Sequence, residues 1–500
     1  MRNTVHLIAY ADRFGGSLAG LTALLRGPFD GVFGGVHVLP FFTPFDGADA
    51  GFDPVDHTRV DPRLGSWADI TDLATTHEVM ADQIINHVSA DSAQFRDVVA
   101  HGDESGYAPM FLTLSSVFPN GATEDQLTAI YRPRPGLPFT AIALGGRVRY
   151  VWTTFTAAQI DIDVRSAPGG AYLDSILDAA TDAGVSALRL DAVGYAIKTP
   201  GTSCFMTPET IAFIDEFAAK AHTRGVEVLV EVHSHFARQI AIARSVDRVY
   251  DFALPALVLH TLYTADAQAL VRWLQIRPDN AVTVLDTHDG IGVVDVGPDP
   301  VEGPGLLTPV QVHELVEEIH RRTGGTSRLA TGTSAANVDI YQVNSTFYDA
   351  LGRDDERYLS ARTLQLFVPG IPQVYYVGLL AGGNDMELLD RTGVGRDINR
   401  HHYTHAEIAE DLRRPVVGAL LALCRFRNTH PAFDGPCETT LADGHLRLLR
   451  RGRAVAGAWA RADIDLATGV TQLAWGDGDR EWSAPVAELA NRWGVSSEVS

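Results

Sequence analysis

Eight short apolar runs, each ending at polar residues and a turn, constrain the fold of this chain most strongly. The runs are Val5–Ile8, Val36–Leu39, Met80–Ile85, Ala187–Leu190, Val226–Val230, Val249–Phe252, Ala281–Leu285 and Gln373–Val377. Short runs that are apolar throughout are typical of parallel strands, which are buried on both faces. Amphipathic helical patterns lie between several of them, for example at 171–183 and 208–223, where Thr207 is the expected N-cap.

This alternation predicts an α/β protein built on a (β/α)8 TIM barrel. A doubly wound sheet would also alternate, but the first run lacks the glycine-rich phosphate-binding fingerprint of that fold. Two intervals are too long for loops, and the pattern after about residue 433 alternates as antiparallel strands do. We therefore expect an insertion after strand 3, another after strand 7, and a C-terminal antiparallel β domain. The expected boundaries are 1–87, 165–290 and 352–432 for the barrel (domain A), 88–164 for inserted domain B, 291–351 for inserted domain B′, and 433–500 for the C-terminal domain.

Charge and cysteine content narrow the class of function. The formal net charge of −22 disfavours nucleic acid and anionic membranes as partners. The three cysteines, Cys204, Cys424 and Cys437, show neither a disulfide framework nor a zinc-binding spacing. The chain has no signal-peptide core and no apolar stretch of membrane-spanning length. We expect a cytoplasmic enzyme.

Acidic residues end two consecutive runs, at Asp191 and Glu231. In a barrel the active site lies at the carboxyl ends of the strands, and neighbouring strands are about 4.8 Å apart. Carboxyl groups at adjacent tips would then lie roughly 5–5.5 Å apart, the separation in retaining glycosidases. Arg189 shares a face with Asp191, so we expect it to lower the pKa of Asp191 and keep this nucleophile ionised. Glu231, after an apolar run, suits proton donation.

Other polar groups follow the runs. Asp289 ends a more distant run. We expect it to hydrogen-bond sugar hydroxyls and to stabilise an oxocarbenium-like state. A single Asp after a strand is usually a turn residue, but three acids at three strand ends, each beside a His or Arg, indicate a site. His233 and His235 share a strand face and resemble a metal pair, but no third ligand is evident, so we expect no metal.

Four motifs carry a resemblance to a known family: DQIINH (82–87), LRLDAV (188–193), VLVEVH (228–233) and LDTHD (285–289). In this order they resemble glycoside hydrolase family 13, the α-amylase family. Within it, the chain resembles the sucrose phosphorylase subfamily over nearly its full length, weakening after about residue 433. The stretches that match the subfamily are 39–54, 115–124, 131–140, 201–210, 249–260, 280–293, 339–352 and 395–403.

The resemblance implies a reaction and its residues. The reaction is phosphorolysis of sucrose to α-D-glucose 1-phosphate and fructose, with transglucosylation as a side activity, no metal or organic cofactor, and in some relatives a homodimer. It implies Asp191 as nucleophile, Glu231 as acid/base and Asp289 as transition-state stabiliser. It assigns the glucosyl site to Asp49, His87, Arg189, His288 and Arg396, with Phe52 and Phe155 as an apolar wall. It assigns the acceptor side to Arg134, Tyr195, His233, Tyr341 and Gln342, and implies Phe205 and Ile340 as further substrate-binding residues.

Two departures and one question concern the acceptor side. His235-Phe236 stands where the subfamily pattern leads us to expect two tyrosines, and Ile340 where we expect leucine. An acidic protein must also admit anionic phosphate, and we expect Arg134 with His233 to provide the local positive charge. We further expect a loop carrying 339–342 to present Tyr341 at one stage and to withdraw Asp339 at another.

Alternatives to sucrose phosphorolysis are still open at this point. They are a sucrose 6-phosphate or glucosylglycerol phosphorylase, a sucrose hydrolase, and a catalytically inactive sugar-binding subunit. The intact acids Asp191, Glu231 and Asp289 argue against the last.

Overall fold

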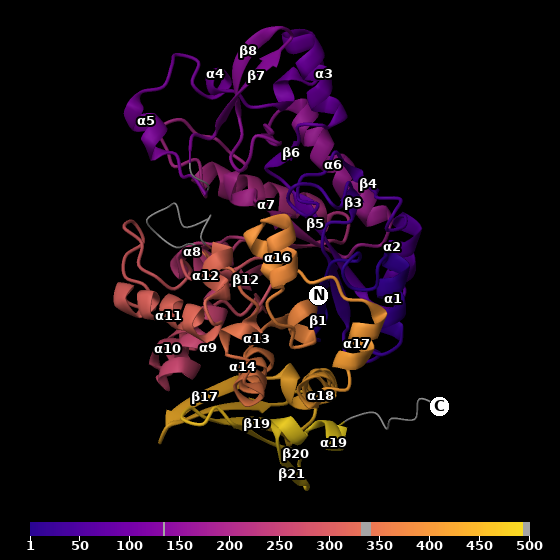
Figure 1. Cartoon of the computed structure of the whole chain (residues 1–500), viewed down its shortest axis with the longest axis vertical. Helices are drawn as coiled ribbons and strands as arrows, with labels where there is room; N and C mark the ends of the chain where they lie inside the picture. Colours follow the sequence, from indigo (N-terminus) through magenta and orange to yellow (C-terminus); the bar gives the residue numbers. More distant parts are fainter. Residues whose placement is uncertain (134–135, 332–341, 494–500) are drawn as a thin grey trace.

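The computed structural model describes residues 1–133, 136–331 and 342–493. All eight predicted runs form strands, and together they close one barrel in the order β1-β16-β13-β12-β11-β10-β5-β2 (Figure 1). The prediction of a (β/α)8 barrel is therefore confirmed. The barrel strands are β1 (His6–Ala9), β2 (Gly35–Val38), β5 (Glu78–Ile84), β10 (Ala187–Asp191), β11 (Glu227–Val230), β12 (Arg248–Asp251), β13 (Ala281–Thr283) and β16 (Ile371–Tyr375).

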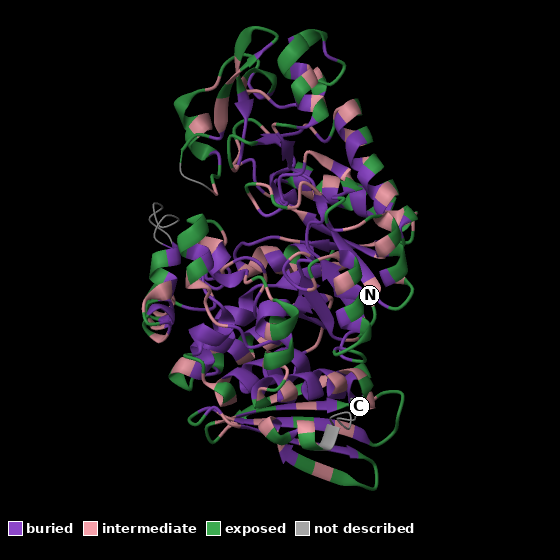
Figure 2. Cartoon of the chain, turned by 45° about the vertical axis from the view of Figure 1, so that its right-hand side comes forward, coloured by how far each residue is buried: buried purple, intermediate pink, exposed green. Residues whose placement is uncertain are grey.

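Every neighbouring pair in the barrel is parallel, including the closing pairs of β1 with β2 and with β16. The strands are buried on both faces, as their apolar character requires, and Figure 2 shows the barrel in the colour of buried residues. In this fold helices cover the outside of the barrel and side chains fill the inside. The helices between barrel strands or after the last one include α1 (Leu18–Arg26), α2 (Trp67–Ala74), α6 (Ala167–Asp182), α7 (Pro208–His222), α8 (Phe236–Ile242), α9 (Ala253–Thr264), α10 (Gln268–Ile276), α14 (Asp355–Phe367), α15 (Tyr376–Leu379), α16 (Met386–Thr392), α17 (His405–Asp411) and α18 (Pro415–Thr429).

Local sequence explains where the helices start. The hydroxyl of Thr207 accepts the backbone N–H of Thr210 and Pro208 opens α7, as predicted. Ser166 caps α6 in the same way, by accepting the N–H of Gly169. The buried face of α7, formed by Ile214, Phe217, Ala218 and Ala221, packs on the barrel.

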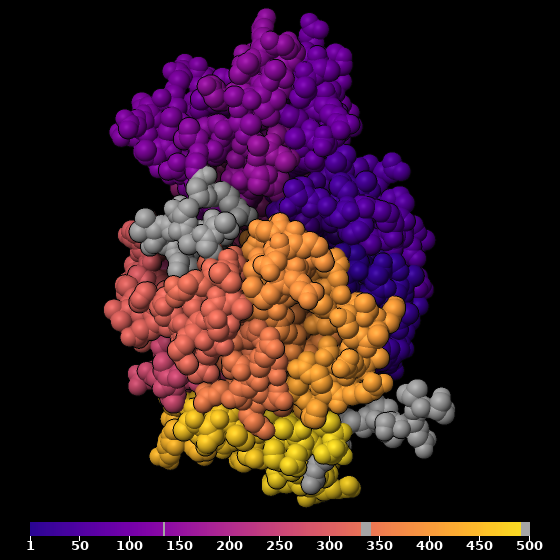
Figure 3. Space-filling model, in the orientation of Figure 1, coloured from indigo at the N-terminus to yellow at the C-terminus, as the bar shows by residue number. Residues whose placement is uncertain are grey.

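A long segment leaves the barrel after β5 and returns before β10. Its ends lie together, since β6 (His87–Ser89) pairs antiparallel with β9 (Gln159–Asp161). The segment has a small core of its own around Trp152 and Phe118. In Figure 3 it forms the lobe at the top of the molecule. Its other elements are α3 (Ala93–His101), α4 (Leu114–Val117), α5 (Glu124–Ala129), β7 (Phe139–Leu144) and β8 (Arg147–Trp152).

Two further parts follow. After β13 the chain forms β14 (Ile291–Gly292), which pairs antiparallel with β15 (Gln342–Val343). A five-stranded antiparallel sheet lies at the opposite end of the molecule from the inserted lobe (Figure 1), which confirms the predicted C-terminal β domain. The remaining elements are β3 (Phe42–Thr43), β4 (Asp56–Val60), α11 (Pro309–Arg322), α12 (Thr326–Thr331), α13 (Phe347–Ala350), β17 (Cys437–Ala442), β18 (His445–Arg451), β19 (Ala458–Asp465), β20 (Thr471–Asp477), β21 (Glu481–Pro485) and α19 (Ala490–Trp493).

Within the described ranges, no helix combines the length and the apolar character needed to cross a membrane.

Candidate active site

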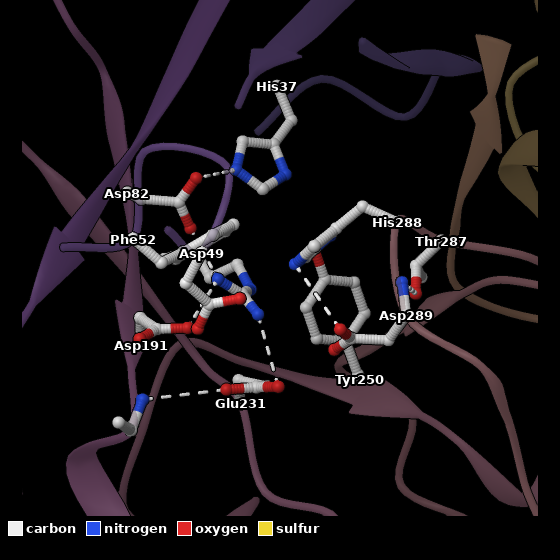
Figure 4. A network of polar contacts seen from close by, with 12 residues as sticks. His37, Asp49, Phe52, Asp82, Asp191, Glu231, Tyr250, Thr287, His288 and Asp289 are labelled. Carbon is white, nitrogen blue, oxygen red and sulfur yellow. Dashed lines mark hydrogen bonds and ion pairs between the residues drawn. The ribbon is translucent and has the colours of Figure 1, made fainter. Parts of the chain in front are cut away.

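The barrel brings the three predicted acids to its carboxyl end. Asp191 is the last residue of β10, Glu231 follows β11 directly, and Asp289 comes six residues after the end of β13. Leu190 pairs with Val230 in the parallel register. The residues that follow them, Asp191 and Glu231, therefore lie at the same height along the barrel axis. Figure 4 shows all three carboxylates directed into one space. Parallel strands end at the same rim, which is why the predicted cluster exists.

One guanidinium holds both members of the carboxylate pair. Arg189 Nη1 lies 3.0 Å from Asp191 Oδ1, and Nη2 lies 3.1 Å from Glu231 Oε1. The backbone N–H of Ala192, the residue after Asp191, lies 3.5 Å from Glu231 Oε2. The Arg189 side chain is 3% exposed. Solvent therefore screens these ion pairs only weakly.

Arg189 lowers the pKa of Asp191, as predicted, but the expected net result, a lowered pKa, is wrong. Burial raises the pKa of Asp191 well above its ordinary value; Arg189 opposes this, and the carboxylates of Glu231, Asp82 and Asp289 add to it. The main physical reason is burial of the carboxylate; in addition, Arg189 is shared, because it also binds Asp82. The carboxyl groups around Arg189 thus outnumber the positive charges. Such an arrangement stabilises a positive charge that develops on a group bound between them.

Arg189 is anchored by a buried pair, Asp82 and His37, that lies beneath the site. Neither residue was given a role on the basis of the sequence. Asp82 on β5 accepts a hydrogen bond from Arg189 on one oxygen and lies 2.9 Å from His37 Nε2 on the other. Arg189 and Asp82 are register partners on adjacent strands. Burial would raise the pKa of Asp82, but His37 and Arg189 outweigh it and the pKa is lowered. Asp82 opens the DQIINH motif, which was the available signal.

Asp289 has separate partners. Arg396 Nη1 lies 2.8 Å from Asp289 Oδ1, and His288 Nε2 lies 3.7 Å from the same oxygen. Burial would raise the pKa of Asp289, but the positive charge of Arg396 is the largest of the effects that lower it, and this carboxylate is ionised. Burial also lowers the pKa of His288 well below its usual range, which makes His288 a neutral imidazole. Arg396 and His288 thus join the cluster as predicted.

Aromatic rings form a wall beside these acids. The ring of Phe52 stacks on His288, with centroids 4.8 Å apart and an interplanar angle of 11°. The Arg189 guanidinium lies 5.5 Å from the Phe52 centroid. Phe155 packs against His87 at 5.3 Å. Flat apolar faces beside carboxylates are typical of sites that bind sugar rings.

Gln159 connects the remaining predicted groups of this wall, and the sequence analysis missed it. Its side-chain Nε2 lies 3.3 Å from Asp49 Oδ2 and 3.1 Å from His87 Nε2, while His87 Nε2 donates to Phe52 O at 2.9 Å. Burial lowers the pKa of His87. Gln159 stands on β9 in the inserted segment, where no strand-end pattern could have identified it.

The acceptor-side residues are brought together only in part. Tyr195 lies between Phe155 and Phe205, with ring centroids 5.2 Å and 4.7 Å away. The Gln342 side-chain amide nitrogen lies 3.2 Å from His233 Nε2, which is itself 4.0 Å from Glu231 Oε1. Four residues of the predicted acceptor side lie outside the described residues, namely Arg134, Asp339, Ile340 and Tyr341. The predicted movement of the loop 339–342 therefore stays a prediction.

The two rings of the His233-x-His235 pair have different partners. His235 Nε2 lies 3.2 Å from Pro304 O, and its Nδ1 accepts the N–H of Ala237 at the start of α8. The departure at 235–236 therefore contacts the segment after β14, and Phe236 packs 6.0 Å from Trp273.

The described residues contain one group of three metal-ligating side chains within 4.8 Å of one another, formed by Glu231, His233 and Asp289. Each is already engaged by a protein partner: Glu231 by Arg189, Asp289 by Arg396, and His233 by Asp295 through its Nδ1 at 3.2 Å. This is an arrangement of acid, base and charge-balancing groups. Asp295, like Gln159, was not anticipated from the sequence.

The chain closely resembles known proteins in sequence and in structure. No protein-family model matches the chain. Sucrose phosphorylase from Agrobacterium vitis is 61% identical over 445 residues, covering 89% of this chain and 91% of that protein. Sucrose phosphorylase from Bifidobacterium adolescentis is 58% identical over 446 residues, covering 89% of this chain and 88% of that protein. The solved structure of sucrose 6F-phosphate phosphorylase from Thermoanaerobacter thermosaccharolyticum superposes with a TM-score of 0.89 at 37% identity, covering 97% of this chain and 98% of that one.

Proposed function

The chain belongs to the sucrose phosphorylase family, and we propose that Asp191, Glu231 and Asp289 carry out the reaction of that family in it. The reaction is the reversible phosphorolysis of sucrose to α-D-glucose 1-phosphate and fructose, which makes the chain a glycosyltransferase. The observation that supports these roles best is the Arg189 guanidinium, which binds both Asp191 and Glu231 at adjacent strand ends. A pair of carboxyl groups at adjacent strand ends suits a double displacement with retention.

In the first half-reaction, the proposed acid is Glu231. It protonates the glycosidic oxygen while Asp191 attacks the anomeric carbon, so that the C1–O bond to fructose breaks and an ester to Asp191 forms. Positive charge develops on the glucosyl ring, and the crowded carboxylates, with ionised Asp289 among them, stabilise it. Asp49, Phe52, His87, Phe155, Arg189, His288 and Arg396 would hold the glucosyl ring.

In the second half-reaction, phosphate replaces fructose. A phosphate oxygen attacks C1, the ester bond to Asp191 breaks, and Glu231 accepts the proton that phosphate loses. Two inversions at C1 give net retention, hence the α-anomer. We propose Arg134, Tyr195, Phe205, His233, Ile340, Tyr341 and Gln342 as the acceptor side, where fructose and phosphate bind in turn. Arg134→Ala should then slow phosphorolysis more than hydrolysis, and an equal loss of both would remove Arg134 from the phosphate site.

We also propose a setting for the enzyme. All three cysteines lie in the described part of the chain and none is bonded to another, which favours a cytoplasmic location. The net charge of −22 disfavours nucleic acid as a partner. The resemblance favours a homodimer. We further propose that the segments 88–164 and 291–351 act as inserted domains on the barrel.

The experiment is incubation with sucrose, with and without phosphate, while both glucose 1-phosphate and free glucose are measured. We expect glucose 1-phosphate to dominate when phosphate is present. Free glucose alone would indicate a hydrolase. Turnover of sucrose 6-phosphate or glucosylglycerol but not of sucrose would select a related phosphorylase, and no turnover at all would indicate a sugar-binding protein.

A further inference from the structure

The chain has two lysines, and one of them, Lys198, is buried next to residues of the proposed site. Its ammonium nitrogen lies 2.8 Å from Asp161 Oδ2 and 2.8 Å from Asn86 Oδ1, and it donates to the carbonyl oxygen of Tyr195. An ammonium has three N–H groups, so these three oxygens match its donors. The hydroxyl of Thr154 is a fourth contact, at 3.3 Å. One side chain therefore joins the segment after β10 to both ends of the inserted lobe.

Three of these contacts lie directly beside rings of the proposed site. Asn86 directly precedes His87, and Thr154 directly precedes Phe155. The third contact, Tyr195, is a ring of the site itself. The His87 and Phe155 centroids are 5.3 Å apart, and the Phe155 and Tyr195 centroids are 5.2 Å apart. These three rings, which we call the ring row, are continuous from the glucosyl side to the acceptor side, and the ammonium contacts each of them through its backbone or its neighbour.

Asp161 fixes the position of this ammonium. Its carboxylate also accepts the backbone N–H of Thr154 at 2.9 Å, and Asp161 pairs with His87 in the register of β6 and β9. The Lys198 and Asp161 side chains are 1% and 0% exposed, so solvent screens their attraction only weakly. Removal of the ammonium would leave a buried carboxylate and two further buried oxygens without this donor, which favours a rearrangement of the ring row.

We propose that Lys198 is a positioning residue whose ammonium holds the ring row in place, so that the glucosyl ring is correctly oriented and the glucosyl enzyme is passed to phosphate rather than to water. This inference rests on the proposed function and deepens it. Lys198 acts through His87 and Phe155 on the glucosyl side and through Tyr195 on the acceptor side. A displacement of a positioning group by about 1 Å can lower a rate about a hundredfold, and a loosened ring row admits water to the ester on Asp191.

The test is the steady-state kinetics of Lys198→Met, in which methionine replaces the apolar part of the side chain but not the charge. Two quantities are measured: KM for sucrose, and the ratio of glucose 1-phosphate to free glucose at fixed phosphate. Neither depends on how much of the enzyme is folded, so a loss of stability alone changes neither. We expect KM to rise and the ratio to fall, each by at least about fivefold and up to about a hundredfold.

Arg427→Met is a matched control, because Arg427 is also buried but lies at the amino end of the barrel, away from the site. Its guanidinium donates to Leu366 O at 3.0 Å, to Gly370 O at 3.3 Å and to the side chain of Asn3. Gly370 and Asn3 precede β16 and β1. The variant should lower stability in urea without changing KM or the ratio. An equal change in Arg427→Met, or no change in Lys198→Met, would overturn the proposal.

Chemical rescue tests whether the ammonium itself is needed. Lys198→Ala removes the outer methylenes and the ammonium, a fragment of the size of n-propylammonium. Adding n-propylammonium should return KM and the ratio toward the parent values, whereas tetramethylammonium, a cation without N–H groups, should not. Lys220→Ala, which loses an exposed ion pair with Asp174, should respond to neither salt. No rescue, or equal rescue by both salts, would contradict a role for the N–H donors of Lys198.

The outcome for the parent chain is separate from these comparisons. Failure of the parent chain to make glucose 1-phosphate would contradict the proposed function, and KM for sucrose would still test the role of Lys198 in a chain that hydrolyses sucrose. An unchanged KM and ratio in Lys198→Met, with phosphorolysis by the parent chain confirmed, would contradict the inference alone.

Discussion

Lys198→Met should destabilise the junction between the inserted lobe and the barrel by about 3–5 kcal/mol, the usual cost of removing one partner of a buried ion pair. Lys198 Nζ lies 2.8 Å from Asp161 Oδ2, and the two side chains are 1% and 0% exposed. The ammonium also donates to Asn86 Oδ1 at 2.8 Å and to the carbonyl of Tyr195. Methionine fills the space but leaves the Asp161 carboxylate buried with only Thr154 as a donor.

The assay is urea unfolding followed by tryptophan fluorescence, for which Trp152 is a local reporter because Lys198 Nζ lies 5.6 Å from its ring. Asp161→Asn alone should also destabilise the protein, but the double variant should lose less than the sum of the two by at least about 2 kcal/mol. Lys220, the only other lysine, offers a matched control. Its ion pair with Asp174 is exposed, so Lys220→Met should cost less than about 1 kcal/mol. Additive losses in the double variant, or equal losses for the two lysines, would show that the buried ion pair with Asp161 does not stabilise this junction.

Two other predictions concern pH and the sugar wall. Burial lowers the pKa of His57 to about 4, so its neutral form stabilises the fold above pH 6.5 and this stabilisation is lost as the pH falls toward 4. Each pH unit of this shift corresponds to about 1.4 kcal/mol, so between pH 6.5 and 4 the free energy of unfolding, measured in urea, should fall by roughly 3 kcal/mol less in His57→Gln than in the parent chain. An identical fall in both proteins would contradict this prediction. Phe52→Ala removes the ring stacked on His288, and kcat/KM for sucrose should fall at least about tenfold, whereas an unchanged value would exclude Phe52 from the sugar site.

The barrel and its three acids were predictable because both depend on local patterns. Each buried strand is a short apolar run, and a catalytic group that follows such a run must reach the same rim. Asp191, Glu231 and Asp289 could therefore be placed together before any distance was known. The start of α7 at Thr207 and Pro208 was predictable for the same reason.

The partners of those acids could not be predicted, because they come from distant parts of the chain. His37 reaches Asp82 from another strand, and Gln159 reaches Asp49 from the inserted lobe. The sign of the pKa shift at Asp191 was mispredicted because the sequence shows Arg189 beside Asp191, but shows neither the depth of burial of Asp191 nor the other carboxylates that share Arg189. Asp295 stands in a loop without regular spacing, and only the fold brings it to His233.

Identification of the residue that carries the glucosyl group is the decisive test of Asp191 as the nucleophile. The enzyme is mixed with sucrose in the absence of phosphate, quenched by rapid denaturation and digested, and the peptides are analysed by mass spectrometry. We predict one hexosyl adduct on the peptide containing Asp191, absent from Asp191→Asn, with the α-anomer of glucose 1-phosphate formed when phosphate is added. An adduct on Glu231 or Asp289, or a β-anomeric product, would contradict the assignment of Asp191 as the nucleophile of a retaining double displacement.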